Sequence, residues 1–147
     1  MKITNEGLEL IKQAESFKAL PYLCPAKVPT IGYGSTFYEN GTKVSMNDKA
    51  ISKEYATELL IEVAAEFGSK LLIKKPLTDN QFSSCVSLAY NIGTGAFNGS
   101  TLLKKININP NDETIFEEFL KWNKAGGKVL QGLGIRRNKV SRLYFKK

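Results

Sequence analysis

Glu15 is a carboxyl group at the edge of an apolar helix face. On a helical wheel it falls between Leu8 and Ile11, on the flank of the apolar stripe and in the last turn of the expected helix. Apolar surroundings and the partial negative charge of a helix C-terminus both disfavour a carboxylate, so we expect a raised pKa. A carboxylic acid that stays protonated near neutral pH can act as a general acid. A boundary glutamate paired with an arginine is the structural alternative.

The absence of histidine excludes several other kinds of site. The chain has no His and only two cysteines, Cys24 and Cys85. Ser–His and Cys–His nucleophilic mechanisms need an imidazole, and so do zinc sites of the Cys₂His₂ or His₃ kind. Two cysteines cannot supply a four-thiolate site, and we expect them to be free thiols. We therefore expect no metal and no cofactor.

The N-terminal third must position Glu15 between a helix and a small sheet. Residues 3 to 17 have helical apolar spacing, with Thr4 as the candidate N-cap. Residues 20 to 46 contain prolines and glycines that break helices, together with side chains that suit short strands. The dipeptide Asn40-Gly41 is a signal for a two-residue hairpin, so we expect a small antiparallel sheet here.

The rest of the chain is predicted to be helical. Residues 52 to 73 form a long helix that could link two lobes and that ends at Pro76-Leu77. Thr78 and Gln81 form a capping box that opens an apolar, central helix, and Gly93 ends that helix. Shorter helices are expected over three further ranges: 101–107, 112–124 and 133–146. The pattern predicts five to seven helices and one sheet, which is confined to the N-terminal lobe: an α+β protein.

Composition and charge limit the possible partners. The 147 residues are 42% hydrophobic and 24% charged, which is typical of one globular domain. The net charge is +7, and residues 121 to 147 carry nine basic residues and no acidic one. This stretch favours a polyanionic partner, which could be nucleic acid, cell wall or anionic membrane. The N-terminus lacks the pattern of a secretory signal, and no apolar run reaches about 18 residues, so we expect a soluble protein made in a cytoplasm.

Four motifs in sequence order resemble the phage-type lysozymes, glycoside hydrolase family 24. Glu15, eight residues, Cys24, five residues and Thr30 match the family's catalytic pattern of Glu, then Asp or Cys, then Thr. Segments 76–82 (PLTDNQF) and 87–93 (SLAYNIG) are similar to its central helix. The segment FNGSTL follows, and WNKAGGK, with Gly132-Leu133 and Arg136-Arg137, is similar to its C-terminal segment. The resemblance covers nearly the whole chain.

The resemblance implies a lysozyme-like fold and a muramidase activity. It implies one domain over residues 1–147, with a β-hairpin lobe over about residues 15–55 and a helical lobe over 1–14 and 56–147. In a cleft between the lobes, Glu15 would protonate the β-1,4 bond between N-acetylmuramic acid and N-acetylglucosamine in bacterial peptidoglycan. Cys24 and Thr30 would hold or activate water on the opposite face of the sugar. A separation of roughly 6.5–9.5 Å suits inverting enzymes, whose water lies between the two groups.

Three departures from the family pattern affect the expected site. Position 24 is Cys where many relatives have Asp, and an unperturbed thiol is mostly neutral at pH 7, so either its pKa is depressed or Thr30 does most of the positioning. Ser35 stands where some relatives carry a histidine near the acid. An arginine must then supply positive charge, and we expect Arg137, then Arg136, to pair with Glu15. Val140 stands where many relatives have a glutamate.

Hydroxyl, amide and aromatic groups near the motifs are candidate saccharide contacts. They are Tyr33, Ser35, Asn91 and Ser100. Strand packing, a helix terminus and an N-cap are the structural alternatives for these residues.

Two other functions stay open at this stage. A lytic transglycosylase would cleave the same bond without water, and a catalytically weak, wall-binding relative would bind without turnover. No helix-turn-helix, zinc finger or aromatic strand platform argues for nucleic acid. We expect a monomer without stable membrane insertion that acts on the cell wall after release from the cytoplasm of a bacterial host and causes its lysis.

Overall fold

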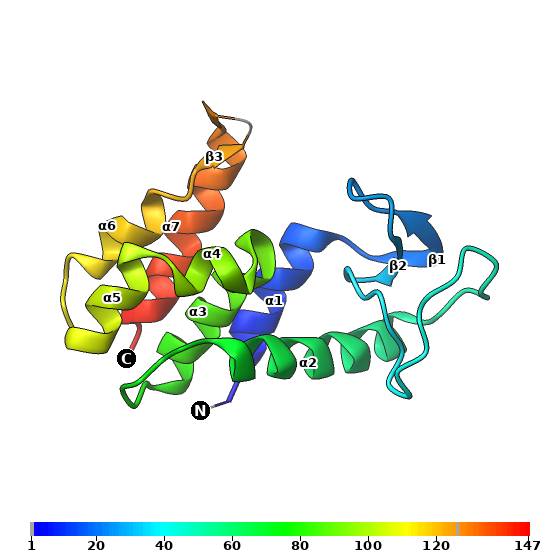
Figure 1. The fold of residues 1–147 in the computed structure, drawn as a ribbon, viewed down its shortest axis with the longest axis horizontal. Helices are drawn as coiled ribbons and strands as arrows, with labels where there is room; N and C mark the ends of the chain where they lie inside the picture. Colours follow the sequence, from blue (N-terminus) through cyan, green and yellow to red (C-terminus); the bar gives the residue numbers. More distant parts are fainter. Residues whose placement is uncertain (1, 126) are drawn as a thin grey trace.

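A computed structural model describes residues 2–125 and 127–147 of the chain. A small β-lobe lies at one end and a bundle of helices at the other, with the long helix α2 running along one side of both (Figure 1). Over these residues no helix is both long and apolar enough to cross a bilayer. The elements, in chain order, are α1 (Asn5–Glu15), β1 (Lys18–Leu23), β2 (Pro29–Gly32), α2 (Lys53–Lys70), α3 (Asp79–Ile92), α4 (Thr94–Asn98), α5 (Thr101–Ile108), α6 (Ile115–Leu120), β3 (Lys124–Ala125), β4 (Lys128–Val129) and α7 (Gln131–Phe145).

Helix α1 ends at the residue with the candidate acid. Thr4 is its N-cap, as predicted, and the Thr4 hydroxyl accepts a hydrogen bond of 3.0 Å from the Gly7 amide. The helix ends at Glu15 because Ser16 adopts a positive φ of 59° and donates its amide to the Lys12 carbonyl. The chain then leaves at once as β1, so Glu15 lies at the junction between the two lobes.

The β-lobe is smaller and less regular than the sequence indicates. Strands β1 and β2 pair antiparallel, with Tyr22 opposite Thr30, and the register is interrupted between Lys18 and Tyr22. Later residues contribute only isolated bridges, such as Phe37 with Lys43. The predicted two-residue turn is wrong: the Tyr38 amide bonds to the Thr42 carbonyl, which leaves a three-residue loop with Gly41 at a φ of +84°.

Helix α2 links the lobes and is shorter than predicted. Ser52 caps it, and its inner face buries Leu59 and Leu60. The predicted extension to residue 73 is wrong, because the helix ends at Lys70. Beyond it the Asn98 and Asn107 side chains accept hydrogen bonds of 2.9 and 2.8 Å from the backbone amides of Leu72 and Lys74. These amide side chains hold the segment in an extended path that replaces the last helical turn.

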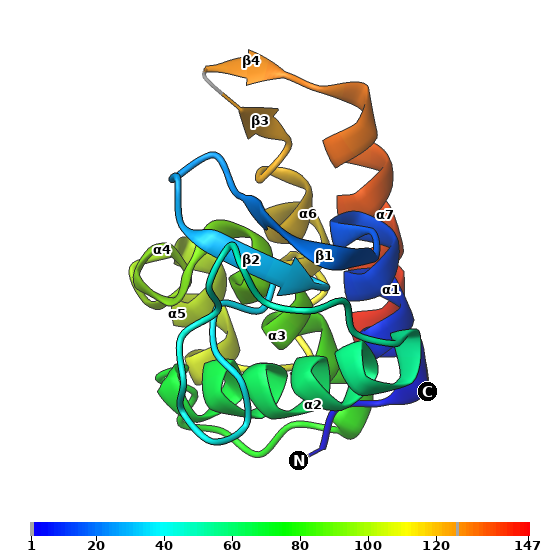
Figure 2. The ribbon, with the colours of Figure 1, turned by 90° about the vertical axis from the view of Figure 1, so that its right-hand side faces the viewer.

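Helix α3 is the buried centre of the helical lobe, as predicted. The capping box of Thr78 and Gln81 forms at its start, and Gly93 ends it. Helices α1, α2 and α7 surround it in the two views of the ribbon (Figures 1 and 2). Both cysteines are free thiols. Cys85 is completely buried inside α3, and this burial raises the pKa of its thiol far above the usual range.

The C-terminal part departs from the prediction in two ways. The helix expected over residues 112–124 is reduced to α6, because Asp112 accepts hydrogen bonds from the amide and hydroxyl of Thr114 and forms a turn. The prediction that all strands lie in the N-terminal lobe is also wrong, since β3 and β4 form a second two-stranded sheet. Gly127, with a φ of +80°, allows the reversal between them. The α+β class itself is confirmed.

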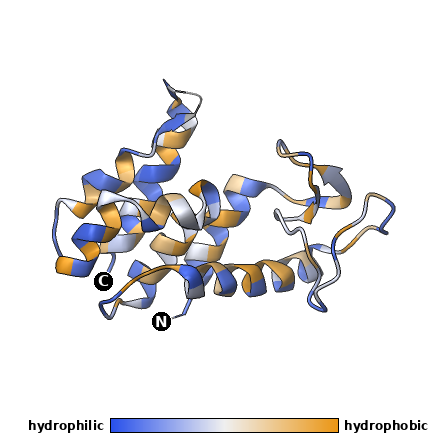
Figure 3. Cartoon of the chain, in the orientation of Figure 1, coloured by the Kyte–Doolittle hydropathy of each residue, from blue (hydrophilic) through white to orange (hydrophobic). Residues whose placement is uncertain are grey.

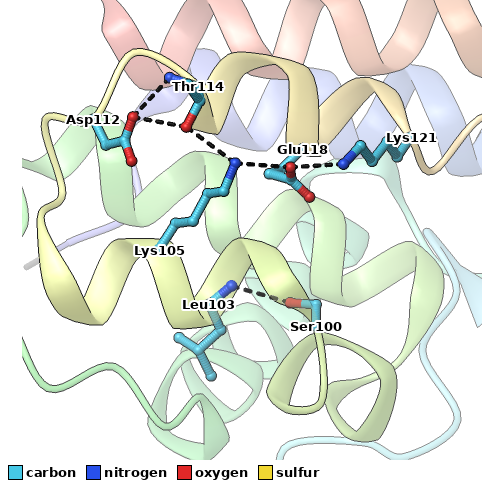
Figure 4. A network of polar contacts seen from close by, with 7 residues as sticks. All are labelled: Ser100, Leu103, Lys105, Asp112, Thr114, Glu118 and Lys121. Carbon is cyan, nitrogen blue, oxygen red and sulfur yellow. Dashed lines mark hydrogen bonds and ion pairs between the residues drawn. The ribbon is translucent and has the colours of Figure 1, made fainter.

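A buried carboxylate ties α5 to α6 (Figure 4). Glu118 is 5% exposed and accepts from Lys105 at 3.0 Å and from Lys121 at 2.8 Å. Lys105 also donates to the Thr114 hydroxyl. Hydrogen bonds from the two ammonium groups lower the pKa of Glu118. The network therefore holds the ionised carboxylate where an isolated charge would be costly.

We predict that Glu118→Gln destabilises the fold by about 1–3 kcal/mol at neutral pH, because it removes charge-assisted hydrogen bonds from a buried position. The pKa of Glu118 is lower in the folded chain than in the unfolded chain. Its stabilising contribution is therefore present above the ordinary glutamate pKa and is lost as the pH falls through the folded value. The difference between variant and wild type should shrink in acid, which urea unfolding at several pH values measures.

Glu117→Gln is the matched control, because Glu117 is the exposed neighbour of Glu118 on α6. It should change the free energy of unfolding by less than about 0.5 kcal/mol. Equal effects of the two substitutions would contradict a specific role for the buried network.

Candidate active site

The Glu15 carboxyl group is partly buried between the two lobes. Burial raises the pKa of Glu15, and the positive charge of Arg136 acts in the opposite direction. Within the described ranges 2–125 and 127–147, no ion pair reaches this carboxylate. Desolvation is the larger effect, so the direction of the pKa shift agrees with the expectation for a proton donor.

A glycine allows the β-lobe backbone to approach the acid closely. Gly34 has a φ of +92°, and a β-carbon there would lie 3.2 Å from Glu15 Oε2 and 3.1 Å from Tyr90 Oη. Tyr90, on α3, donates its hydroxyl to the Tyr33 carbonyl at 2.7 Å. This bond fixes the 33–34 backbone against the end of α1. The close approach of the Gly34 backbone contributes to the burial that raises the pKa of Glu15.

Cys24 and Thr30 are brought together by the tight turn between β1 and β2. The Cys24 amide bonds to the Val28 carbonyl at 3.1 Å, and the Lys27 amide bonds to the Cys24 carbonyl at 2.7 Å. Thr30 is buried, and its hydroxyl donates to the Val28 carbonyl at 2.8 Å. Hydrogen bonds from the Val28 and Ala26 amides lower the pKa of the Cys24 thiol.

One groove contains all three residues of the predicted catalytic pattern. It has a volume of about 980 Å³, within the range of ligand-binding clefts, and its walls come from the β-lobe, α2 and the end of α3. Glu15, Cys24 and Thr30 line it, together with Asn91. The arrangement offers a raised-pKa acid on one side and a hydroxyl and a low-pKa thiol from the β-lobe, the pair of functions that acid-assisted bond cleavage with water requires.

Three predicted saccharide contacts lie outside this groove. Ser35 is completely buried, and its hydroxyl has no hydrogen-bond partner among the described residues. Tyr33 is also buried and packs its ring against Phe17. Ser100 is the N-cap of α5: its hydroxyl donates to the Phe97 carbonyl and accepts from an amide of the helix. In this structure Tyr33 and Ser35 are buried and Ser100 caps a helix, as the structural alternatives described.

The predicted ion pair between Glu15 and Arg137 does not form in this structure. The buried Arg137 guanidinium donates to the Trp122 carbonyl at 2.7 Å and to Asn91 Oδ1. These bonds satisfy it and orient Asn91 at the groove. Arg136 is the exposed neighbour, and its charge is the one that lowers the pKa of Glu15. Both arginines line a second, smaller pocket of about 210 Å³ that Glu15 also borders.

The sequence reasoning missed Tyr22, Gly34 and Tyr90 as parts of the site. All three line the groove. Tyr22 precedes Cys24 by two positions on a strand, and the two-residue period would have placed both side chains on one face. Tyr90 had no such signal, because polar and apolar residues are both distributed around its helix and do not mark which side faces the groove.

The chain matches known proteins over nearly its full length. The sequence profile described as "Phage lysozyme" matches residues 12–140. An endolysin of Bacillus phage B103 is 41% identical over 99% of this chain and 54% of the relative. An endolysin of Acyrthosiphon pisum secondary endosymbiont phage 1 is 38% identical over 99% of this chain and 98% of the relative. The chain thus spans about half the length of the relative from Bacillus phage B103 and of a similar endolysin from Bacillus phage PZA. It spans nearly all of the relative from the endosymbiont phage.

Solved structures of lysozymes have the same fold. A point mutant of P22 lysozyme superposes with a TM-score of 0.84, at 34% identity over 99% of each chain. The muramidase domain of SpmX from Asticaccaulis excentricus gives a TM-score of 0.80 at 30% identity, over 99% of each chain. The lysozyme-like fold predicted from the motifs is therefore confirmed. With a family profile covering most of its residues and relatives of this similarity, the chain belongs to the phage lysozyme family.

Proposed function

We propose that this protein is an endolysin that hydrolyses the β-1,4 bond between N-acetylmuramic acid and N-acetylglucosamine in bacterial peptidoglycan. One observation carries the proposal. A partly buried carboxyl group with a raised pKa, Glu15, borders the groove that Cys24 and Thr30 also line. The names of the relatives, endolysin and muramidase domain, support the same activity.

Glu15 acts as the general acid. Its proton passes to the glycosidic oxygen as the bond to the sugar carbon breaks, which makes the leaving sugar a neutral alcohol. Gly34 and Tyr90 keep one side of the carboxyl dry, so the protonated form persists at a pH where an exposed glutamate is ionised. Arg136 then stabilises the carboxylate that remains after the transfer, since opposite charges attract.

Thr30 and Cys24 act on the attacking water. Because the Thr30 proton is committed to the Val28 carbonyl, the Thr30 oxygen can only accept a hydrogen bond from the water. That bond turns a water lone pair toward the sugar carbon. Cys24, whose thiolate is favoured by the surrounding amides, takes the proton that the water loses as the new carbon–oxygen bond forms. The water therefore ends up on the sugar, and the muramic acid is left with a reducing end.

The substrate, and thus the place of action, is the bacterial cell wall. Asn91, held by Arg137, is positioned to donate its amide to a sugar in the groove. The protein functions as a monomer in host lysis after release from the cytoplasm. Lytic transglycosylation is not favoured by a site that has groups for holding water.

We predict that Glu15→Gln lowers the rate of peptidoglycan hydrolysis by about 10²- to 10⁴-fold, the range that general acids contribute. The measurement is clearing of purified peptidoglycan, with mass spectrometry of the products. Each wild-type cut should add one water, which an anhydro product would lack. The folded state should be retained, as shown by an unchanged or higher melting temperature.

Glu9→Gln is the matched control, because Glu9 lies on the same helix, is exposed and pairs with Lys12. It should keep nearly full activity. A Glu15→Gln protein that clears the wall at the normal rate would sink the assignment of the acid.

We predict that Cys24→Ala is weaker than wild type by roughly 10²-fold, whereas Cys24→Asp stays active. A carboxylate remains ionised to a lower pH than a thiolate does, so the acid side of the pH–rate profile should extend to lower pH in Cys24→Asp. Initial rates over a pH series measure both effects. Equal profiles for all three proteins would mean that position 24 is structural.

We predict that Arg136→Gln moves the alkaline side of the pH–rate profile to higher pH. Arg136 lowers the pKa of Glu15, so its removal raises that pKa and keeps the acid protonated further. The maximal rate should fall at the same time, because the carboxylate loses its cation. Arg142→Gln, an exposed arginine on the same helix, removes the same charge and should leave the profile in place.

A further inference from the structure

The exposed side of β4 and α7 gathers large apolar side chains. Val129, Leu130 and Ile135 keep 63%, 44% and 53% of their surface exposed, and they line one shallow hollow of about 540 Å³. Lys139 and Arg142 line the same hollow. We refer to these five residues as the β4–α7 face. A contiguous group of exposed apolar side chains that is bordered by polar residues is typical of a binding surface.

The β4–α7 face is strongly cationic. It lies within residues 121 to 147, which contain nine basic residues and no acid. Glu118 pairs with Lys121 outside the face, and Glu6, which pairs with Lys146, lines a neighbouring hollow with Lys139 and Arg142. No ion pair of Lys139 or Arg142 occurs within residues 2–125 and 127–147. Their charges are therefore available to an anionic partner.

This face lies at an end of the molecule where a flat partner can reach it. In Figures 1 and 2 the β3–β4 sheet projects beyond the helical bundle at the start of α7. Hydrophobic and hydrophilic residues alternate along this helix (Figure 3). Ile135, Lys139 and Arg142 follow the i, i+4, i+7 spacing of one helix face, while Val140 and Tyr144 on the other side are buried in the core. The face can thus bind without disturbing the packing of α7.

We propose that the β4–α7 face binds the surface of an anionic lipid bilayer, with the three apolar side chains in the interface and the two cations at the lipid phosphates. Charge alone would suit any polyanion. A hydrophilic polymer, however, would leave Val129, Leu130 and Ile135 facing water, whereas the headgroup region of a bilayer removes them from it. This binding is peripheral and needs no turnover of peptidoglycan, although Ile135 and Lys139 also line the small pocket that Glu15 borders.

The test is sedimentation of the full chain with vesicles of phosphatidylglycerol and phosphatidylcholine in equal parts, compared with vesicles of pure phosphatidylcholine. Wild type should bind the anionic vesicles, and more weakly at high salt. The triple variant Val129→Ser, Leu130→Ser, Ile135→Asn should lose at least about tenfold in affinity. The pair Lys139→Gln, Arg142→Gln should lose roughly fivefold for each cation.

Matched controls change the same chemistry elsewhere on the surface. Ile108→Ser with Leu72→Ser removes two exposed apolar side chains far from this face in sequence, and Lys49→Gln with Lys75→Gln removes two exposed cations. Both control proteins should bind like wild type, or within about twofold when corrected for net charge. Circular dichroism melting of every variant checks that the fold is kept.

Three results would overturn the proposal. One is the absence of binding to anionic vesicles at low salt. Another is an equal loss of binding in the control proteins and in the variants of the face. The third is a loss with the cation pair but not with the apolar triple variant, which would make the face a general polyanion surface. Arg136 is left unchanged throughout because it belongs to the proposed site.

Discussion

The site depends on the removal of water from one side of a single carboxyl group. Helix α1 could have ended in solvent, where Glu15 would titrate like any surface glutamate. It ends instead against the 33–34 backbone, which the Tyr90 hydroxyl holds at 2.7 Å. That hydrogen bond joins the central helix of one lobe to the β-lobe beside the acid. The raised pKa of Glu15 is therefore a property of the contact between lobes as much as of its own helix.

Charge around the groove is distributed unevenly. Glu62 and Glu66 of α2 line its long wall, and Glu39 lines the β-lobe side. The basic residues Arg136, Arg137 and Lys139 of α7 line the smaller pocket that Glu15 also borders, and the charge of Arg136 lowers the pKa of Glu15. A neutral sugar backbone experiences little net attraction from such walls, so binding in the groove relies on hydrogen bonds and surface contact. The cations of α7 are left for an anionic partner.

The sequence predicted the order and the starts of the main helices better than the positions of the side chains around the groove. The caps at Thr4, Ser52 and Thr78 and the stop at Gly93 have local causes, so local patterns found the start of α1 and both ends of α3. The end of α2 depends on Asn98 and Asn107, which are far away in the sequence, and no local signal could place it. Resemblance to a family identified Glu15, Cys24 and Thr30, which the fold brings to one groove.

Predictions that depended on side-chain direction were less successful. Arg137 and Arg136 are neighbours on a helix, and a rotation of about 100° decides which one is buried. The sequence favoured Arg137 as the partner of Glu15. In the structure the Arg137 guanidinium donates to the Trp122 carbonyl and to Asn91 Oδ1 instead. Ser35 and Tyr33 illustrate the same difficulty in a short, irregular strand region, where an isolated bridge rather than a regular ladder sets the facing of each residue.

The two thiols differ in accessibility, so Cys24 can be labelled at the groove while Cys85 stays unlabelled. Cys85 is sealed inside α3, and the pKa of its thiol is raised, so electrophiles in the surrounding solution do not reach it in the folded chain. Cys24 is partly accessible and its pKa is lowered. A thiol-directed dye should accordingly attach once per molecule, at the groove that Cys24 lines. Its emission would follow occupancy of that groove without any engineered residue.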